Sequence, residues 1–297
     1  MRIPASRAMY AFSAEHPPAA TVPPGTRVVF ETRDCFSNRL QEERDSFFEV
    51  GWENINPATG PLAVTGAEPG DTLVVTVEQV KVGPRGTMIA VPGFGALGHL
   101  ITREETRIIP ISQGLASFGP VELVMEPMIG VIGTQPEGEA IPCGTPGPHG
   151  GNLDTRLIRE GAVVYLPVYV PGAGLALGDL HALMGDGEIV VCGLEVPGEV
   201  TVTVDLVKGR RAPGPVVWHG GTWYVLASAL TLDEASRLAI EQAVDFVRER
   251  TGLTLNHAAM LLSLVGQLQV SQVVDPLKTA RMAIPGQLLA AYGGDRF

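Results

Sequence analysis

The order of apolar and polar residues predicts strands through most of the chain. Apolar or β-branched runs bounded by Gly, Pro, Asn or Asp are typical of strands. Such runs occur at residues 28–32, 73–82, 121–125, 163–170, 188–191, 200–207, 223–226 and 270–274. No sequence period of about 20–50 residues recurs, which argues against a solenoid or a propeller. The body of the protein is therefore expected to be β-rich.

Two helices are predicted near the carboxyl terminus. In residues 231–251, Thr231 can cap the first turn, apolar residues recur at helical spacing, and acidic residues precede the arginines. Residues 256–265 predict a shorter helix that ends near Gly266. The carboxy-terminal part is therefore expected to be α+β.

These patterns predict a β-rich α+β fold in three parts. Residues 1–140 are expected to form an N-terminal β domain, residues 141–225 a central β module, and residues 226–297 a small α+β portion. Many turns are expected because the chain has 36 Gly and 24 Pro. Residues 142–152 are predicted to be an ordered loop, since long loops in compact domains are often functional.

Composition and charge exclude several classes of protein. A net charge of −11 with no basic cluster argues against a nucleic-acid partner. Residues 1–15 lack the pattern of a secretory signal, which favours a cytoplasmic protein. The most apolar stretch, residues 162–184, contains Pro, Gly, Asp and His, so it predicts a buried segment and no membrane span. A symmetric homodimer is expected for a β enzyme of this size.

The three cysteines, Cys35, Cys143 and Cys192, are widely spaced and form no Cys-x-x-Cys pair. This pattern excludes a disulfide framework and a cysteine-rich zinc site. Cys143 lies in a Pro/Gly loop and could be an accessible nucleophile. The preferred interpretation is that all three are ordinary reduced thiols, because no thiol-protease signature surrounds them.

Two segments carry most of the potential metal ligands. Asp179 and His181 are two positions apart, so both side chains would leave the same face of a strand and could form one corner of a metal site. A hydrogen-bonded structural pair is the alternative. The second segment supplies His149 and Asp154 around two glycines that allow close approach of the backbone. Together the segments could hold one ion with an open position for water.

Two further polar segments are ordinary turns when taken alone. Asp34 follows the predicted strand at residues 28–32, and residues 56–61 form an Asn/Pro/Gly turn.

Taken together, these segments resemble the acetamidase/formamidase family. The resemblance is carried by Asp34-Cys35 and by residues 56–61 (NPATGP), 66–71 (GAEPGD), 148–154 (PHGGNLD), 178–182 (GDLHA), 184–188 (MGDGE) and 271–276 (SQVVDP). The motifs occur in the family's order over residues 20–285. The combination is highly specific and covers nearly the whole chain.

The resemblance implies a fold of jelly-roll or β-sandwich and barrel-like modules. It also implies a bound divalent metal, with zinc as the expected ion. The expected reaction is hydrolysis of formamide or acetamide to a carboxylate and ammonia. The resemblance points to a set of site residues: Asp34, His149, Asp154, Asp179, His181, Asp186, Glu188 and Glu195.

The working hypothesis is a metal-dependent hydrolase of a small linear amide. Asp179, His181 and one or both of His149 and Asp154 would hold the metal, and Glu195 is a further candidate ligand. Glu188, with Asp186 or Asp34 as alternatives, would accept the proton of water. Spare carboxylates could bind calcium. The alternatives are a non-catalytic metal- or carbohydrate-binding β protein and a cysteine amidase that uses Cys143.

Overall fold

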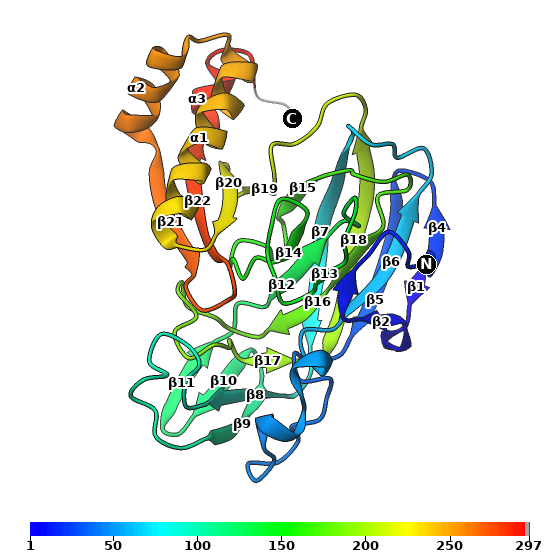
Figure 1. Ribbon diagram of the computed structural model, residues 1–297, viewed down its shortest axis with the longest axis vertical. Coiled ribbons are helices and arrows are strands. Elements are labelled where there is room, and N and C mark those ends of the chain that lie inside the picture. Colours follow the sequence, from blue (N-terminus) through cyan, green and yellow to red (C-terminus); the bar gives the residue numbers. More distant parts are fainter. Residues whose placement is uncertain (295–296) are drawn as a thin grey trace.

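The computed structural model describes residues 1–294 and 297, and it consists mainly of two large β-sheets (Figure 1). The first sheet has nine strands. In spatial order these are β1 (Arg2–Ile3), β5 (Thr26–Thr32), β18 (Gly198–Val207), β7 (Thr72–Val82), β15 (Val163–Pro167), β19 (Val216–His219), β20 (Thr222–Ala229), β22 (Lys278–Pro285) and β21 (Gln267–Gln272).

The second sheet has eleven strands, and its middle carries the residues of the candidate site. Its main path is β11 (Val121–Val124), β10 (Leu115–Phe118), β9 (Glu105–Ser112), β8 (Arg85–Ala90), β17 (Glu195–Val196), β16 (Leu175–His181), β12 (Met128–Gly133) and β14 (Gly150–Asn152). Strand β6 (Ala58–Val64) also pairs with β16, and it pairs in turn with β2 (Ala8–Met9) and β4 (Ala20–Val22). Strands β3 (Ala11–Phe12) and β13 (Ile141–Pro142) form a small separate sheet.

The two large sheets enclose the main hydrophobic core. Strands of the first sheet contribute residues such as Phe30, Val75 and Val202, while Leu62 and Leu177 come from the second sheet. All five are fully buried. The alternation of apolar and polar residues in β7 and β18 therefore predicts correctly which face of each strand is covered.

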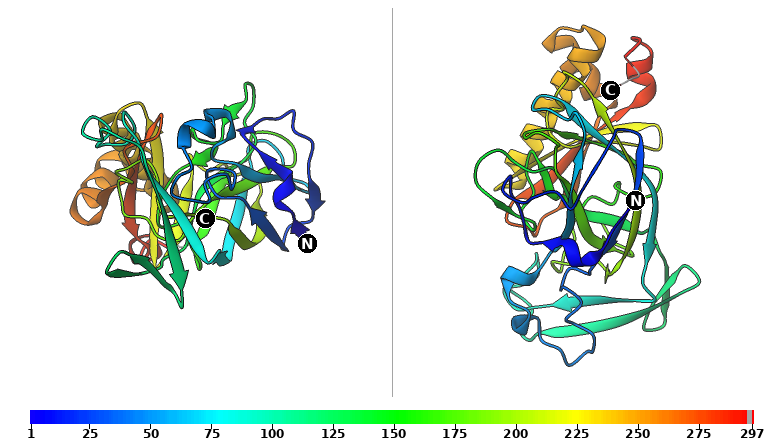
Figure 2. Two further views of the ribbon diagram at one scale, coloured as in Figure 1. Left: turned by 90° about the horizontal axis from the view of Figure 1, so that it is seen from below. Right: turned by 90° about the vertical axis from the view of Figure 1, so that its right-hand side faces the viewer.

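Three helices cover the end of the first sheet formed by β19 to β22, as the views in Figures 1 and 2 show. They are α1 (Leu232–Thr251), α2 (Leu255–Val265) and α3 (Gly286–Ala290); short 3-10 helices are η1 (Ala5–Arg7), η2 (Phe47–Glu49) and η3 (Trp52–Asn54). The hydroxyl oxygen of Thr231 accepts a hydrogen bond from the backbone of Glu234, and Gly252 ends α1 in the left-handed conformation. In the part of the chain that the structure describes, no helix is long and apolar enough to cross a membrane.

The β-rich α+β prediction is confirmed, and both predicted helices are present. One strand prediction is wrong, and one strand is present but displaced. Residues 188–191 form a turn, and the strand predicted at residues 270–274 lies at residues 267–272. The three-domain division stays a prediction; strands from residues 1–140 and from residues 141–225 pair with one another in both sheets.

Candidate metal centre

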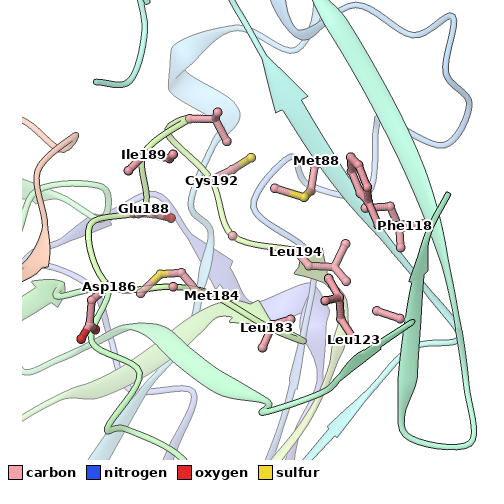
Figure 3. A pocket seen from close by; sticks show the side chains of 15 residues that line it. Met88, Phe118, Leu123, Leu183, Met184, Asp186, Glu188, Ile189, Cys192 and Leu194 are labelled. Atoms are coloured by element: carbon pink, nitrogen blue, oxygen red, sulfur yellow. The ribbon is translucent and has the colours of Figure 1, made fainter. Parts of the chain in front are cut away.

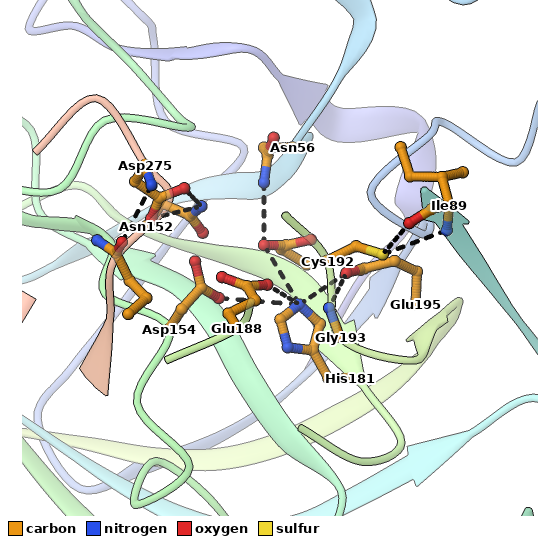
Figure 4. Close-up of polar contacts among 12 residues, drawn as sticks. Asn56, Ile89, Asn152, Asp154, His181, Glu188, Cys192, Gly193, Glu195 and Asp275 are labelled. Carbon is orange, nitrogen blue, oxygen red and sulfur yellow. Dashed lines mark hydrogen bonds and ion pairs between the residues drawn. The ribbon is translucent and has the colours of Figure 1, made fainter. Parts of the chain in front are cut away.

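Asp179 and His181 lie at the end of β16, in the middle of the second sheet. Asp179 has a left-handed backbone with φ of 55°, which breaks the regular alternation of the strand. The two side chains nevertheless approach each other, with 3.8 Å between Asp179 Oδ2 and His181 Nε2. Both residues are about 99% buried. The segment therefore delivers an imidazole and a carboxylate to one buried point. Figure 4 shows His181 at this point with Asp154, Glu188 and Glu195 beside it.

Asp154 reaches the same point from the chain that follows β14. Its Oδ1 lies 3.8 Å from His181 Nε2, and its backbone is also left-handed, with φ of 39°. Gly130 of β12 leaves the space that makes this approach possible. A Cβ atom at Gly130 would lie 2.5 Å from Asp154 Oδ1 and 2.7 Å from Asp179 Oδ2.

Glu188 and Glu195 complete the cluster from the turn and strand that follow β16. Glu195 Oε1 lies 3.0 Å from His181 Nε2 and accepts a hydrogen bond of 3.0 Å from the backbone N–H of Gly193. Glu188 Oε1 lies 3.9 Å from the same imidazole nitrogen. Glu188 is a third left-handed residue, with φ of 49°. Strained backbones that gather at one place are typical of functional sites.

Several buried polar atoms of this cluster have no hydrogen-bond partner among the residues that the structure describes. They are both carboxylate oxygens of Asp154, Oδ1 of Asp179, Oε2 of Glu188, Oε2 of Glu195 and both ring nitrogens of His181. A buried polar atom without a partner costs about 1–3 kcal/mol. The atoms lie near one another without hydrogen-bond geometry, so they point to a common ligand that would satisfy them together.

Asp275 adds another carboxylate that the sequence analysis did not assign to the site. Both of its oxygens accept hydrogen bonds of 3.2 Å from Asn152 Nδ2, and its charge contributes to the raised pKa of Asp154. Asp275 belongs to the motif at residues 271–276, and this motif was the feature of the sequence that could have identified it. Asn56, from the turn at residues 56–61, was likewise not assigned, although its Nδ2 donates to Asp179 Oδ2 at 3.0 Å.

The carboxylates are crowded enough to shift one another's ionisation. Burial, strengthened by neighbouring carboxylates, raises the pKa values of Asp154, Glu188 and Asp275 well above their usual range, and burial raises the pKa of Glu195 to about 8. Burial opposes ionisation of His181, but the contacts with Glu195 and Asp179 together outweigh it and raise the imidazole pKa. The cluster thus holds more carboxyl groups than one imidazolium can keep ionised, and a bound cation would allow more of them to ionise.

This donor set fits a divalent cation. An imidazole with carboxylates suits zinc, and the additional carboxylate oxygens suit calcium. Ligand atoms from Asp154, His181 and Glu188 lie within 4.8 Å of one another, and so do those of Cys35, Asp179 and Glu195. The partnerless atoms described above supply the second reason, since a cation would satisfy them and balance their charge.

Three of the predicted site residues have other partners. Asp186 forms a bidentate ion pair with Arg281: its Oδ1 lies 3.0 Å from Nη1 and its Oδ2 lies 2.7 Å from Nη2. Asp34 Oδ1 accepts a hydrogen bond of 2.6 Å from the backbone of Asn38, and burial raises its pKa to about 6. His149 packs edge-on against Phe12, with 5.2 Å between ring centroids.

His149 stands apart from the cluster electrostatically as well. Burial lowers its pKa to about 4, without a contribution from any carboxylate. No ion pair or hydrogen bond within residues 1–294 and 297 joins its ring to the cluster. Both ring nitrogens are buried without a partner, so the role of His149 as a ligand stays a prediction.

The cluster forms one wall of a cavity of about 850 Å³. Asn56, Asp179, Glu188, Glu195 and Asp275 line this wall, so the site can be reached by a small molecule. A structural metal site that only holds loops together has a closed coordination shell and needs no such access, so the cavity favours a catalytic site over a non-catalytic metal-binding protein.

A second cavity, of about 310 Å³, shares Glu188 with the first and is lined by the turn that carries it (Figure 3). Met88, Phe118, Leu123 and Leu194 give it a mainly apolar lining. Asp186 and Glu188 also line it, but Asp179, Glu195 and Asp275 line only the larger of the two cavities, which is therefore the candidate active site.

The cysteines are free thiols. Cys143 is fully buried, and burial raises its pKa to about 12. A thiol with that pKa is neutral near pH 7, which counts against a nucleophilic Cys143.

Comparisons with known proteins agree on one family. The Acetamidase/Formamidase family matches this chain at residues 10–142 and 139–217. The crystal structure of an acetamidase from Bacillus halodurans is 45% identical, with a TM-score of 0.97 over 99% of this chain and 100% of that one.

Two curated proteins are more distant. The formamidase of Methylophilus methylotrophus is 26% identical over 65% of this chain and 62% of its own length. The acetamidase of Mycolicibacterium smegmatis is 27% identical over 65% of this chain and 64% of its own length. The chain thus matches less than two thirds of the length of each of these two proteins.

Proposed function

The chain belongs to the acetamidase/formamidase family, and we propose that it is a metal-dependent amidohydrolase that converts a small linear amide to a carboxylate and ammonia. The observation that carries this proposal is the convergence of His181 and four buried carboxylates, with partnerless atoms, beside an accessible cavity. Formamide and acetamide are the smallest substrates that we propose.

The residues that would hold the metal are His181, Asp154, Asp179 and Glu195. His181 and Asp154 lie beneath the cavity wall, whereas Asp179 and Glu195 line it. A bound divalent cation would polarise the amide carbonyl and make water more acidic. Zinc suits this mixed set better than calcium, which prefers oxygen ligands alone.

Glu188 is the general base in this proposal. It lines the cavity, and its Oε2 has no hydrogen-bond partner among the described residues, so this oxygen is available to accept a proton from water. Glu188 would take a proton from water and return it to the leaving nitrogen. Asp186 is the weaker candidate because Arg281 holds both of its oxygens.

Asn56 is proposed to keep Asp179 ionised and oriented. Burial works against ionisation of Asp179, but contacts with His181 and the hydrogen bond from Asn56 outweigh it and lower the pKa of Asp179. Such a partner fixes a ligand before the metal arrives.

The proposal is tested by metal content and ammonia release measured on Glu188→Gln. A lost general base slows turnover by roughly 10²-fold or more, so this variant should keep its metal and lose most of its activity. Exposed Glu160→Gln is the control and should match the wild type. Loss of metal in Glu188→Gln would make Glu188 a ligand, and near-normal turnover would remove it from the reaction.

The oligomeric state, the cytoplasmic location and the identity of the ion stay predictions from sequence.

A further inference from the structure

The candidate active-site cavity is much larger than formamide or acetamide requires. Its volume is about 850 Å³. Acetamide has four non-hydrogen atoms, and at roughly 30 Å³ for each, the share of one water molecule, it would fill only about 100 Å³. Cavities of about 300–1,000 Å³ usually hold ligands of drug size. The space beyond the reacting amide is therefore the unexplained feature of the site.

Four aromatic side chains in the lining of the cavity pack against one another. They are Phe36, Phe47, Trp52 and Phe94. The rings of Phe47 and Trp52 meet edge to face with 5.2 Å between centroids, and those of Trp52 and Phe94 are 4.9 Å apart. These residues come from the connection between β5 and β6 and from the loop after β8. We call these four residues the aromatic wall.

Trp52 is the member of the aromatic wall that faces solvent. It is 54% exposed, whereas Phe36 and Phe47 are buried beneath it. A large aromatic ring that is exposed at the edge of a cavity can lose that exposure when an apolar ligand binds, and the loss favours binding. The wall thus offers a ready contact for a planar apolar group.

The charges around the cavity restrict the ligand further. Its carboxylates are Glu53, Asp179, Glu188, Glu195 and Asp275, and among the described residues that line it, Lys278 is the lone lysine or arginine. Lys278 Nζ donates a hydrogen bond of 2.6 Å to the backbone oxygen of Asp275, so one of its three donors is already used. A substrate with a second, anionic group would meet repulsion here.

We propose that the preferred substrate is a primary amide whose acyl group carries a neutral aromatic or similarly planar apolar group. The amide would lie at the carboxylate cluster and the apolar group against the aromatic wall. Water attacks the carbonyl carbon, a C–O bond forms, the C–N bond breaks, and the products are an arylalkyl carboxylate and ammonium. This inference rests on the proposed amidohydrolase function.

The test compares kcat/KM for phenylacetamide, acetamide and formamide with metal-loaded full-length protein. Burial of a phenyl ring against the aromatic wall should raise kcat/KM for phenylacetamide over that for acetamide by roughly 10²-fold. Trp52→Ala should reduce this ratio by about tenfold, mainly through KM, and Trp52→Phe should restore most of it.

Tyr292→Ala is the matched control. Tyr292 follows α3, is 50% exposed, and does not line the cavity. It should leave the ratio unchanged. Thermal unfolding of each variant shows whether it is folded.

The outcomes separate this inference from the proposed function. Ammonia release from no amide at all would overturn both. Hydrolysis of formamide and acetamide without a preference for phenylacetamide would overturn this inference alone. A preference that Trp52→Ala leaves intact would also overturn it, because the aromatic wall would then not be the cause.

Discussion

Substitution of Gly130 by alanine should disable the metal centre while leaving the fold in place. The added Cβ would lie 2.5 Å from Asp154 Oδ1 and 2.7 Å from Asp179 Oδ2, and ordinary contacts begin at 3.4 Å. The backbone of Gly130 is outside the left-handed region, so alanine brings no conformational penalty of its own. The Cβ would also lie 2.9 Å from the backbone oxygen of Asp179. The effect should therefore act through the two carboxylates and through a small backbone shift at Asp179, both of which displace candidate metal ligands.

The size of the effect follows from these distances. The carboxylates would have to retreat by about 0.7–0.9 Å to reach 3.4 Å, whereas metal–ligand distances tolerate only about 0.2 Å. Disturbed ligand positions typically cost about 10–100-fold in metal affinity. A misplacement of about 1 Å can lower the rate about 10²-fold. We expect both losses in Gly130→Ala.

Zinc titration and ammonia release should be measured on the same preparation, with thermal unfolding as a test of the fold. Gly185→Ala is the matched control, because a Cβ at Gly185, close in sequence to Glu188, would meet no atom within 4 Å. Wild-type metal affinity in a folded Gly130→Ala variant would refute the assignment of Asp154 and Asp179.

Three further variants test other parts of the account. Gly193→Ala would place a Cβ 2.6 Å from His181 Nδ1, so it should weaken zinc binding by about 10–100-fold; unchanged binding in a titration would exclude His181 as a ligand. His181→Ala should lose metal and ammonia release together, and activity that persists without metal would count against the site. Asp71→Asn should lower the free energy of unfolding by about 1–3 kcal/mol, measured in urea, because Asp71 accepts hydrogen bonds from Lys208 and the backbone of Gly209. Contacts with Lys208 outweigh burial and lower the pKa of Asp71, so this loss should be full above about pH 4 and vanish as the pH falls through the folded pKa; a loss independent of pH would contradict it.

Local signals predicted the helices well. In α1 the capping threonine, the acidic first turn and the terminal glycine all act within a few residues of the chain. The strands β5, β7 and β18 were also recognisable, because each has one face in the core.

The wrong strand prediction and the displaced strand each have a local cause that the apolar pattern does not show. Residues 188–191 contain three β-branched residues, but Glu188 and Val191 have left-handed backbones that form a turn. In the later segment, the side chain of Gln272 accepts hydrogen bonds from the backbones of Val274 and Asp275. These bonds turn the chain away and end β21 earlier than its apolar pattern suggests.

The candidate site was predictable only in part. Asp179 and His181 were found because their spacing places two ligand types together. Asp275 lies about 90 residues further along the chain and reaches Asp154 only through the tertiary fold, so no spacing could reveal it. The aromatic wall likewise forms from segments whose contacts are not encoded in a local pattern.

The most direct test of the central claim follows metal content and ammonia release in one sample. The protein is treated with a chelator, dialysed, and then titrated with zinc while formamide and acetamide hydrolysis are measured. The account predicts that ammonia release disappears with the metal and returns in proportion to zinc, to a plateau at about one catalytic ion per chain. Undiminished ammonia release after the metal has fallen below detection would contradict it.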